Sequence, residues 1–221
     1  MSLLELAMHD QTAPSPWMIR HAGFVKAKTS LLDVACGYGR HSKFFASRGA
    51  LVTAVDRDAA ALTAIRGTNG VTIEQRDLEN HPWPYAPESF DCIVVCNYLW
   101  RPTAAALIAT LKPGGLLLYE TFMVGNERFG SPSRPDFLLR PNELLQWVSG
   151  TFKTLAFDQN QEMGANGMPV AMKQRIAAFK LIPQPAVDDS AKPVAAESPV
   201  ATDSNDGKDG AAVDQPSGAP S

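Results

Sequence analysis

A glycine-rich turn is the first feature of this sequence whose residue types and spacing could do chemistry. The run DVACGYG spans residues 33–39, follows a short apolar stretch and passes straight into a helical pattern. Gly37 and Gly39 permit a tight turn and a close approach of a ligand to the backbone. The helix that follows presents unpaired N–H groups and the positive end of its dipole at the same point. The pattern therefore indicates a small-molecule site.

An acid ends the next apolar run. Asp56 stands directly after residues 51–55, seventeen residues beyond Gly39. A carboxylate has two acceptor oxygens and can bind both hydroxyls of a ribose. A glycine turn between a strand and a helix, with an acid ending the following strand, predicts a nucleoside-containing ligand. The alternative is that the glycines only close a turn and that Asp56 caps the helix after it.

Two residues bear on which nucleoside would bind. A dinucleotide site would have a third glycine three residues after Gly39, but this position is Ser42. Asp33 is an acid beside the turn, which suits a cationic ligand or an amino group. These residues count against a nicotinamide-dependent oxidoreductase, which stays the alternative function.

The elements that must position these residues alternate between strand and helix patterns. We predict strands at 31–35, 51–55, 71–75, 90–99, 116–123, 151–160 and 169–182, and helices at 40–50, 58–66, 101–111 and 141–150. Alternation of this kind means right-handed crossovers and a parallel sheet. The last two strands have no helix between them. We therefore predict an α/β fold, a Rossmann-like, doubly wound, mostly parallel seven-stranded sheet with an antiparallel edge hairpin and helices on both faces.

The composition separates a folded region from a tail. Residues 183–221 carry seven acids, two lysines and six prolines, with no aromatic residue. Such a segment cannot bury enough surface to offset its ordering entropy, so we predict disorder there; an acidic docking tail is the alternative. No run is long enough for a transmembrane helix, and the start of the chain carries no basic region typical of a secretory signal. The net charge of −3 argues against nucleic acid as a partner.

The three cysteines, Cys36, Cys92 and Cys96, are too few for a disulfide scaffold, which favours a reducing, cytoplasmic location. Cys92 and Cys96 are four apart on one strand, too far for a shared metal ion, so we expect no metal site.

Several motifs together carry a family resemblance. Residues 31–58, LLDVACGYGRHSKFFASRGALVTAVDRD, resemble the first two motifs of class I S-adenosylmethionine-dependent methyltransferases. QRDLEN with HPWP (75–84), FDCIVVCNYLW (90–100) and LKPGGLLLYETF (111–122) resemble the later motifs in order and spacing. The ACGYGR turn and residues 125–145 resemble a bacterial small-molecule group that includes tellurite-resistance-type methyltransferases. The resemblance implies a methyltransferase domain at 25–182, with 1–24 as a helical segment covering the site.

The resemblance also implies a cofactor, S-adenosylmethionine, and the residues that would hold it. Ala35 stands where the family has the first glycine of DxGxGxG. Asp33 would orient the amino group of the cofactor, and Gly37 and Gly39 would let its methionine and ribose parts approach the backbone. Asp56 would bind the ribose hydroxyls, and Asp77 with Leu78 would bind the adenine. Asn97 would lie beside the methionine moiety.

The predicted function is methyl transfer to a small-molecule acceptor. We assign no catalytic residue, because transfer from a sulfonium needs orientation more than a base, although His41 or His81 could act as one. Three arginines in loop 124–140, Arg128, Arg134 and Arg140, predict an anionic acceptor unless they are simply solvated. A non-catalytic S-adenosylmethionine-binding module is a further alternative. The sequence predicts no membrane partner and leaves the oligomeric state open.

Overall fold

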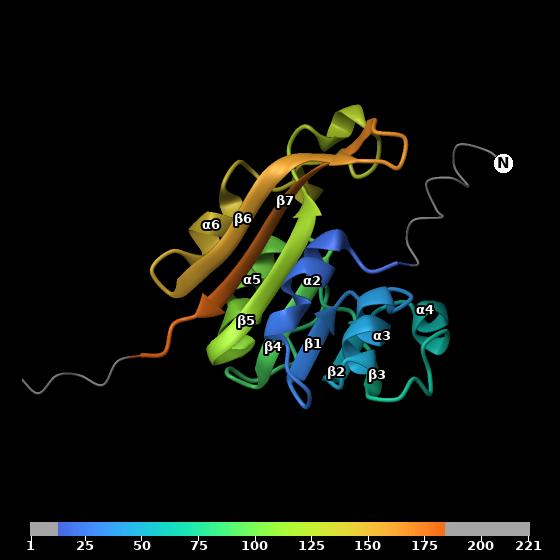
Figure 1. Cartoon of the computed structure of the whole chain (residues 1–221), viewed down its shortest axis with the longest axis vertical. Helices are drawn as coiled ribbons and strands as arrows, with labels where there is room; N and C mark the ends of the chain where they lie inside the picture. The colour runs from blue at the N-terminus through green and yellow to red at the C-terminus, as the bar shows by residue number, and fades with distance from the viewer. Residues whose placement is uncertain (1–12, 184–221) are drawn as a thin grey trace, which may run out of the picture. The chain divides into compact units, whose positions relative to one another are not determined.

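The computed structural model describes residues 13–183 of the 221. In this part of the chain, seven strands form one sheet in the order β3-β2-β1-β4-β5-β7-β6 (Figure 1). The strands are β1 (Ser30–Val34), β2 (Leu51–Asp56), β3 (Val71–Gln75), β4 (Phe90–Cys96), β5 (Leu111–Phe122), β6 (Phe152–Met163) and β7 (Pro169–Lys180). The first five are parallel to one another, whereas β7 is antiparallel to both β5 and β6. The predicted fold class is confirmed.

Helices cover both faces of this sheet. They are α2 (Pro16–His21), α3 (Arg40–Ser47), α4 (Ala59–Thr63), α5 (Ala104–Thr110) and α6 (Glu143–Val148), with 3₁₀ turns η2 (Ala22–Phe24), η3 (Arg101–Thr103), η4 (Asn126–Arg128) and η5 (Pro135–Phe137). Buried side chains of α2, α3 and α4 join one apolar cluster, and those of α5 and α6 join the other. Each cluster lies against one face of the sheet.

The central strand β1 shows how the sequence produces this arrangement. Leu31 belongs to the cluster under α2, α3 and α4, whereas Leu32 and Val34 belong to the cluster under α5 and α6. All three are fully buried, which is the pattern of a parallel strand covered on both faces. Because side chains alternate along a strand, Asp33 lies on the same face as Leu31, beneath α3.

Several element boundaries differ from the prediction, and three of them have a clear local reason. Residues 112–115, which separate the predicted helix 101–111 from the predicted strand 116–123, lie within β5, where the pairing with β4 shifts register between Phe90 and Cys92. Pro102 stands in η3, so the predicted helix 101–111 begins with a 3₁₀ turn. The helix predicted at 141–150 begins only at Glu143, because Asn142 has a left-handed backbone (φ 60°).

The chain ends bear on the predicted domain limits. Residues 1–12 and 184–221 lie outside the described residues, so the predicted acidic tail is described only at Pro183. Of the predicted N-terminal segment 1–24, residues 13–24 are described and contain α2 and η2. No helix of the described part is long and apolar enough to cross a membrane.

Candidate functional site

A cavity of about 270 Å³ lies at the carboxyl ends of β1, β2 and β4. Strand order reverses between β1 and β4, which is where doubly wound sheets bind their ligands. Five of the eight predicted cofactor residues line this cavity, namely Asp33, Ala35, Gly37, Asp56 and Asn97. Gly39, Asp77 and Leu78 are not among its lining residues.

The two glycines of the turn are needed for different reasons. Gly37 has a φ of 53°, lines the cavity and has open space where a Cβ would stand, so a ligand can approach its backbone. Gly39 has a φ of 67° and begins α3, and a Cβ there would come within 2.7 Å of the Ile65 side chain. Gly37 therefore suits ligand binding, whereas Gly39 allows α3 to pack closely.

Asp56 connects the end of β2 to the glycine turn. Its Oδ2 accepts a hydrogen bond from the Gly37 backbone N–H at 2.7 Å, and its Oδ1 accepts one from the Asp58 N–H at 2.9 Å. Each carboxylate oxygen retains a further acceptor site. The cap of α4 is Asp58, whose side chain accepts from the N–H groups of Ala60 and Ala61. Asp56 is thus not the cap of the following helix.

Asp33 is a buried carboxyl group in the lining of the cavity, with 1% of its surface exposed. Burial raises its pKa to about 7, although hydrogen bonds from Ser42 and the charge of Arg40 oppose the rise. The Ser42 hydroxyl donates to Asp33 Oδ2 at 2.6 Å. A desolvated carboxyl group beside a cavity is well suited to a cationic ligand group. The serine that breaks the dinucleotide pattern therefore supports Asp33.

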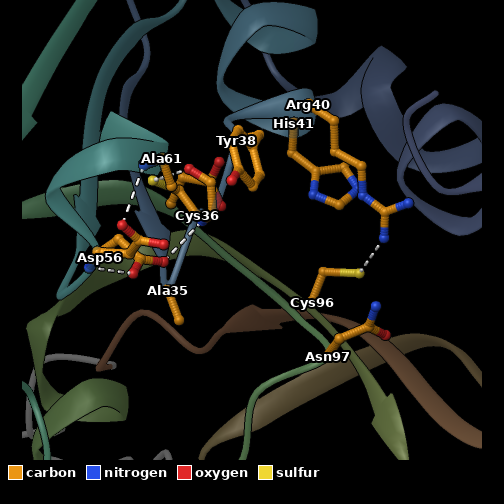
Figure 2. A pocket seen from close by; sticks show the side chains of 12 residues that line it. Ala35, Cys36, Tyr38, Arg40, His41, Asp56, Ala61, Cys96 and Asn97 are labelled. Carbon is orange, nitrogen blue, oxygen red and sulfur yellow. Dashed lines mark hydrogen bonds between the residues drawn. The ribbon is translucent and has the colours of Figure 1, made fainter. Parts of the chain in front are cut away.

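The opposite side of the cavity is formed by residues from α3 and from the end of β4. Figure 2 shows Arg40, His41, Cys96 and Asn97 across from Asp56. The Arg40 guanidinium donates to the Cys96 sulfur at 3.3 Å and to the backbone carbonyl of Ala13 at 3.3 Å. Sequence reasoning left Arg40 and Cys96 out of the site, because nothing in their spacing shows that α3 and β4 meet here.

His41 holds the N-terminal segment rather than acting as a base. Its Nε2 accepts a hydrogen bond from the Ser15 backbone N–H at 3.1 Å. Burial lowers the pKa of His41 to about 3, so the ring stays neutral at physiological pH. The nitrogen that could take a proton is therefore already an acceptor, and His41 fixes the start of α2 beside the cavity.

A buried cluster of charges lies next to this segment, on β5, β6 and β7. Glu120 accepts from Arg175 Nε at 2.8 Å and lies 3.5 Å from Lys173 Nζ, and Glu162 contacts both cations. Burial opposes the ionisation of Glu120, but the two cations outweigh it and hold its pKa below the usual range. Ser15 Oγ donates to Glu120 at 3.0 Å. The cluster thereby fixes residue 15 against the sheet.

Asp77 and Leu78 serve local structure after β3. Asp77 accepts from the backbone N–H groups of Glu79 and Asn80 and from the Asn80 side-chain amide. These hydrogen bonds lower the pKa of Asp77 to about 2. Leu78 is buried in the cluster under α5 and α6. Their proposed contacts with adenine stay predictions.

Comparisons with known proteins bear on this geometry. A family model described as a methyltransferase domain matches residues 31–115, a range that contains all eight predicted cofactor residues. The ubiquinone biosynthesis O-methyltransferase of Stutzerimonas stutzeri is 33% identical over 114 residues, which are 48% of each protein. That of Saccharophagus degradans is 28% identical over 148 residues, 55% of this chain and 62% of the relative. The chain thus spans about half the length of the first of these relatives.

Solved structures share the fold. TehB from Haemophilus influenzae superposes with a TM-score of 0.63 at 20% identity, covering 77% of this chain and 63% of TehB. An S-adenosylmethionine-dependent methyltransferase from Listeria monocytogenes gives a TM-score of 0.58 at 13% identity, covering 75% and 97%. Residues 31–115 thus match the methyltransferase domain family, and the fold is shared with S-adenosylmethionine-dependent methyltransferases. The cofactor of this family is S-adenosylmethionine.

The cavity of this chain fits the chemistry of that cofactor. A buried carboxyl group at Asp33 matches its cationic ammonium, and two acceptor oxygens at Asp56 match its ribose hydroxyls. The open space beside Gly37 admits the ligand to the backbone between them. Arg40, on the opposite side, offers a guanidinium that matches a carboxylate.

The loop between β5 and α6 does not supply the predicted arginine cluster to this cavity. Arg128 donates to the Gly125 carbonyl, and Arg134 lies 3.3 Å from Asp136. Neither these arginines nor Arg140 are among the lining residues of the cavity, and all three are exposed. The anionic acceptor stays a prediction without support from the cavity lining.

Ala35 is strained, and its replacement is expected to stabilise the protein. Its φ is 52°, in the left-handed region that disfavours every residue with a Cβ. We expect Ala35→Gly to raise the free energy of unfolding by about 0.5–1 kcal/mol, since relief of strain exceeds the added entropy of the unfolded chain. Urea denaturation measures this change. Ala60→Gly in α4 is the control, and we expect it to lower the free energy of unfolding by about 1 kcal/mol. A destabilised Ala35→Gly variant would contradict the expected strain.

Proposed function

We propose that this chain transfers a methyl group from S-adenosylmethionine to a small-molecule acceptor. The observation that carries the proposal is the cavity at the strand-order reversal, which Asp33, Asp56 and Gly37 line, with open space beside the Gly37 backbone. Asp33 is fully buried and suits the ammonium group of the ligand, whereas Asp56 is only partly buried and suits its ribose hydroxyls.

In this proposal the protein contributes binding and orientation. The bound cofactor supplies an electrophilic methyl group on its sulfonium. Asp33 holds the ammonium group, Asp56 the ribose hydroxyls and Arg40 the carboxylate, so the sulfonium is fixed relative to the end of β4. Holding two reactants in line can supply a large part of the rate enhancement without a base. This agrees with His41, whose Nε2 is already engaged by the Ser15 N–H.

The names of the relatives favour an oxygen atom as the acceptor. Both are ubiquinone biosynthesis O-methyltransferases, and we extend from them only the class of a small hydroxyl compound. The predicted cytoplasmic location and the predicted absence of nucleic-acid and membrane partners stay predictions. Nicotinamide chemistry is disfavoured, because Ser42 bonds to Asp33 where a dinucleotide site has a glycine.

The first experiment is a thermal shift of the purified protein with S-adenosylmethionine, S-adenosylhomocysteine and NAD in parallel. A ligand at a hundred times its Kd adds about 2.7 kcal/mol to stability. We expect both adenosyl compounds to stabilise the protein and NAD to have no effect. Stabilisation by NAD alone would refute the proposal.

Catalysis needs a second measurement. The protein is incubated with S-adenosylmethionine labelled in its methyl group and a small-molecule extract of cells. We expect label in a compound of low molecular mass. Cofactor binding without any transfer would instead support the non-catalytic binding module.

A further inference from the structure

The hydroxyl group of Tyr98 is buried without a hydrogen-bond partner in the described part of the chain. Tyr98 follows Asn97, which lines the cavity, directly after β4. A buried hydroxyl without a partner is destabilising, so its presence in a native structure needs an explanation.

The ring of Tyr98 is held firmly in place. Asn97 has a left-handed backbone, with a φ of 57°, and its N–H donates to the Glu120 carbonyl at 2.9 Å. The hydroxyl of Tyr119 donates to the backbone carbonyl of Tyr98 at 2.9 Å. The ring itself packs against the apolar cluster that contains Leu78. A local rearrangement that gives the hydroxyl a partner would therefore disturb both β4 and β5.

The surroundings of the hydroxyl belong to the nucleoside side of the site. Burial raises the pKa of Tyr98, and Glu79, Asp77 and Asp56 raise it further, whereas Arg57 opposes them. These four charged groups lie at the end of β2 or shortly after β2 and β3. The hydroxyl thus stays protonated and able to donate, and it lies within electrostatic range of the acid proposed for the ribose and of the acid proposed for the adenine.

We propose that the Tyr98 hydroxyl is a further cofactor-binding group, which forms a hydrogen bond with the adenosine part of S-adenosylmethionine. The proposal rests on the proposed function, because it requires that this cofactor bind in the cavity. Adenosine offers ring nitrogens and ribose oxygens as acceptors for a phenolic donor. Binding of the cofactor gives the hydroxyl the partner that residues 13–183 do not provide.

The test is the substitution Tyr98→Phe, which removes only the hydroxyl. We expect the Kd for S-adenosylhomocysteine to rise roughly three- to tenfold, the range for one hydrogen bond. The Kd for methylthioadenosine, which has the nucleoside without the amino acid, should rise by the same factor. The melting temperature of the ligand-free protein should stay unchanged or rise, since an unpaired hydroxyl is removed. Titration calorimetry and thermal unfolding give these quantities.

Tyr85→Phe is the matched control. Tyr85 is also partly buried, and its hydroxyl lies 3.2 Å from Glu74 Oε2, so it has a partner in the protein. We expect this variant to lose thermal stability while both Kd values stay unchanged.

Three results would overturn the assignment of Tyr98: unchanged Kd values, a loss of stability in the ligand-free protein like that of Tyr85→Phe, or an effect on S-adenosylhomocysteine that methylthioadenosine does not share. If the unaltered protein binds neither compound, the proposed function fails first, and the inference fails with it.

Discussion

Replacing Asp56 with alanine is expected to weaken S-adenosylhomocysteine binding by at least a hundredfold. The carboxylate is proposed to accept hydrogen bonds from two ribose hydroxyls, and each such bond to a charged group contributes about 1.5–3 kcal/mol. Its loss also leaves the Gly37 N–H, 2.7 Å away, without its acceptor, so the turn is less well ordered. Titration calorimetry with S-adenosylhomocysteine measures the loss.

The control for Asp56 is two residues along the chain. Asp58→Asn removes another acid from the cavity lining, but asparagine caps a helix about as well as aspartate, so α4 should persist. We expect its Kd to stay within about threefold of the unaltered protein, because the Asp58 side chain is exposed to solvent, which screens its charge, and is engaged by the N–H groups of Ala60 and Ala61. Normal binding by Asp56→Ala would mean that Asp56 only holds the turn.

Much of this fold was predictable because its strands are buried on both faces. β2 reads as an apolar run ended by an acid, and Asp56 is indeed the last residue of that strand. Asp58 was predictable as a helix cap, since a cap depends on contacts within three residues. The alternation of strand and helix then leaves few topologies, and the acid and the glycine turn must meet at one edge of the sheet.

The rest of the site depends on contacts that no local pattern encodes. Ser15 bonds to Glu120, 105 residues away, and to His41, 26 residues away. Ser42 was read as a missing glycine, but its partner Asp33 lies on the strand before it. Loop 124–140 was read as an arginine cluster, because sequence cannot show that its side chains have partners within the loop.

Asp33 governs how the stability of the ligand-free protein depends on pH. Its pKa is about 7 in the folded protein against 3.8 for the ordinary group, because burial disfavours the charged form. The folded state therefore holds a proton that the unfolded state releases, so stability from this group is present below about pH 4 and is lost as pH rises to about 7. The shift amounts to about 4 kcal/mol in full, of which about 2–3 kcal/mol is lost between pH 5 and pH 8.

Asp33→Asn should remove this dependence at the expense of cofactor binding. Asparagine resembles the neutral carboxyl group, so its stability should not change with pH at this position. Relative to the unaltered protein, the free energy of unfolding of the variant should therefore be about 2–3 kcal/mol more favourable at pH 8 than at pH 5. Urea denaturation at both pH values measures this difference. Its affinity for S-adenosylhomocysteine should fall about 30- to 1000-fold at pH 7.5, because the ammonium loses a buried charged partner. Methylthioadenosine, which lacks the ammonium, should bind as before.

The pH dependence of binding distinguishes an ionised Asp33 from a merely polar one. The ammonium requires the carboxylate, so affinity of the unaltered protein should rise about tenfold per pH unit below pH 7 and level off above it. In Asp33→Asn the profile should be flat from pH 5.5 to 7.5. Ser42→Ala removes a hydrogen bond that lowers the pKa of Asp33, so its profile should move to higher pH. A flat profile in the unaltered protein would show that Asp33 does not meet the ammonium as a carboxylate, and the ammonium would then need another partner in the cavity.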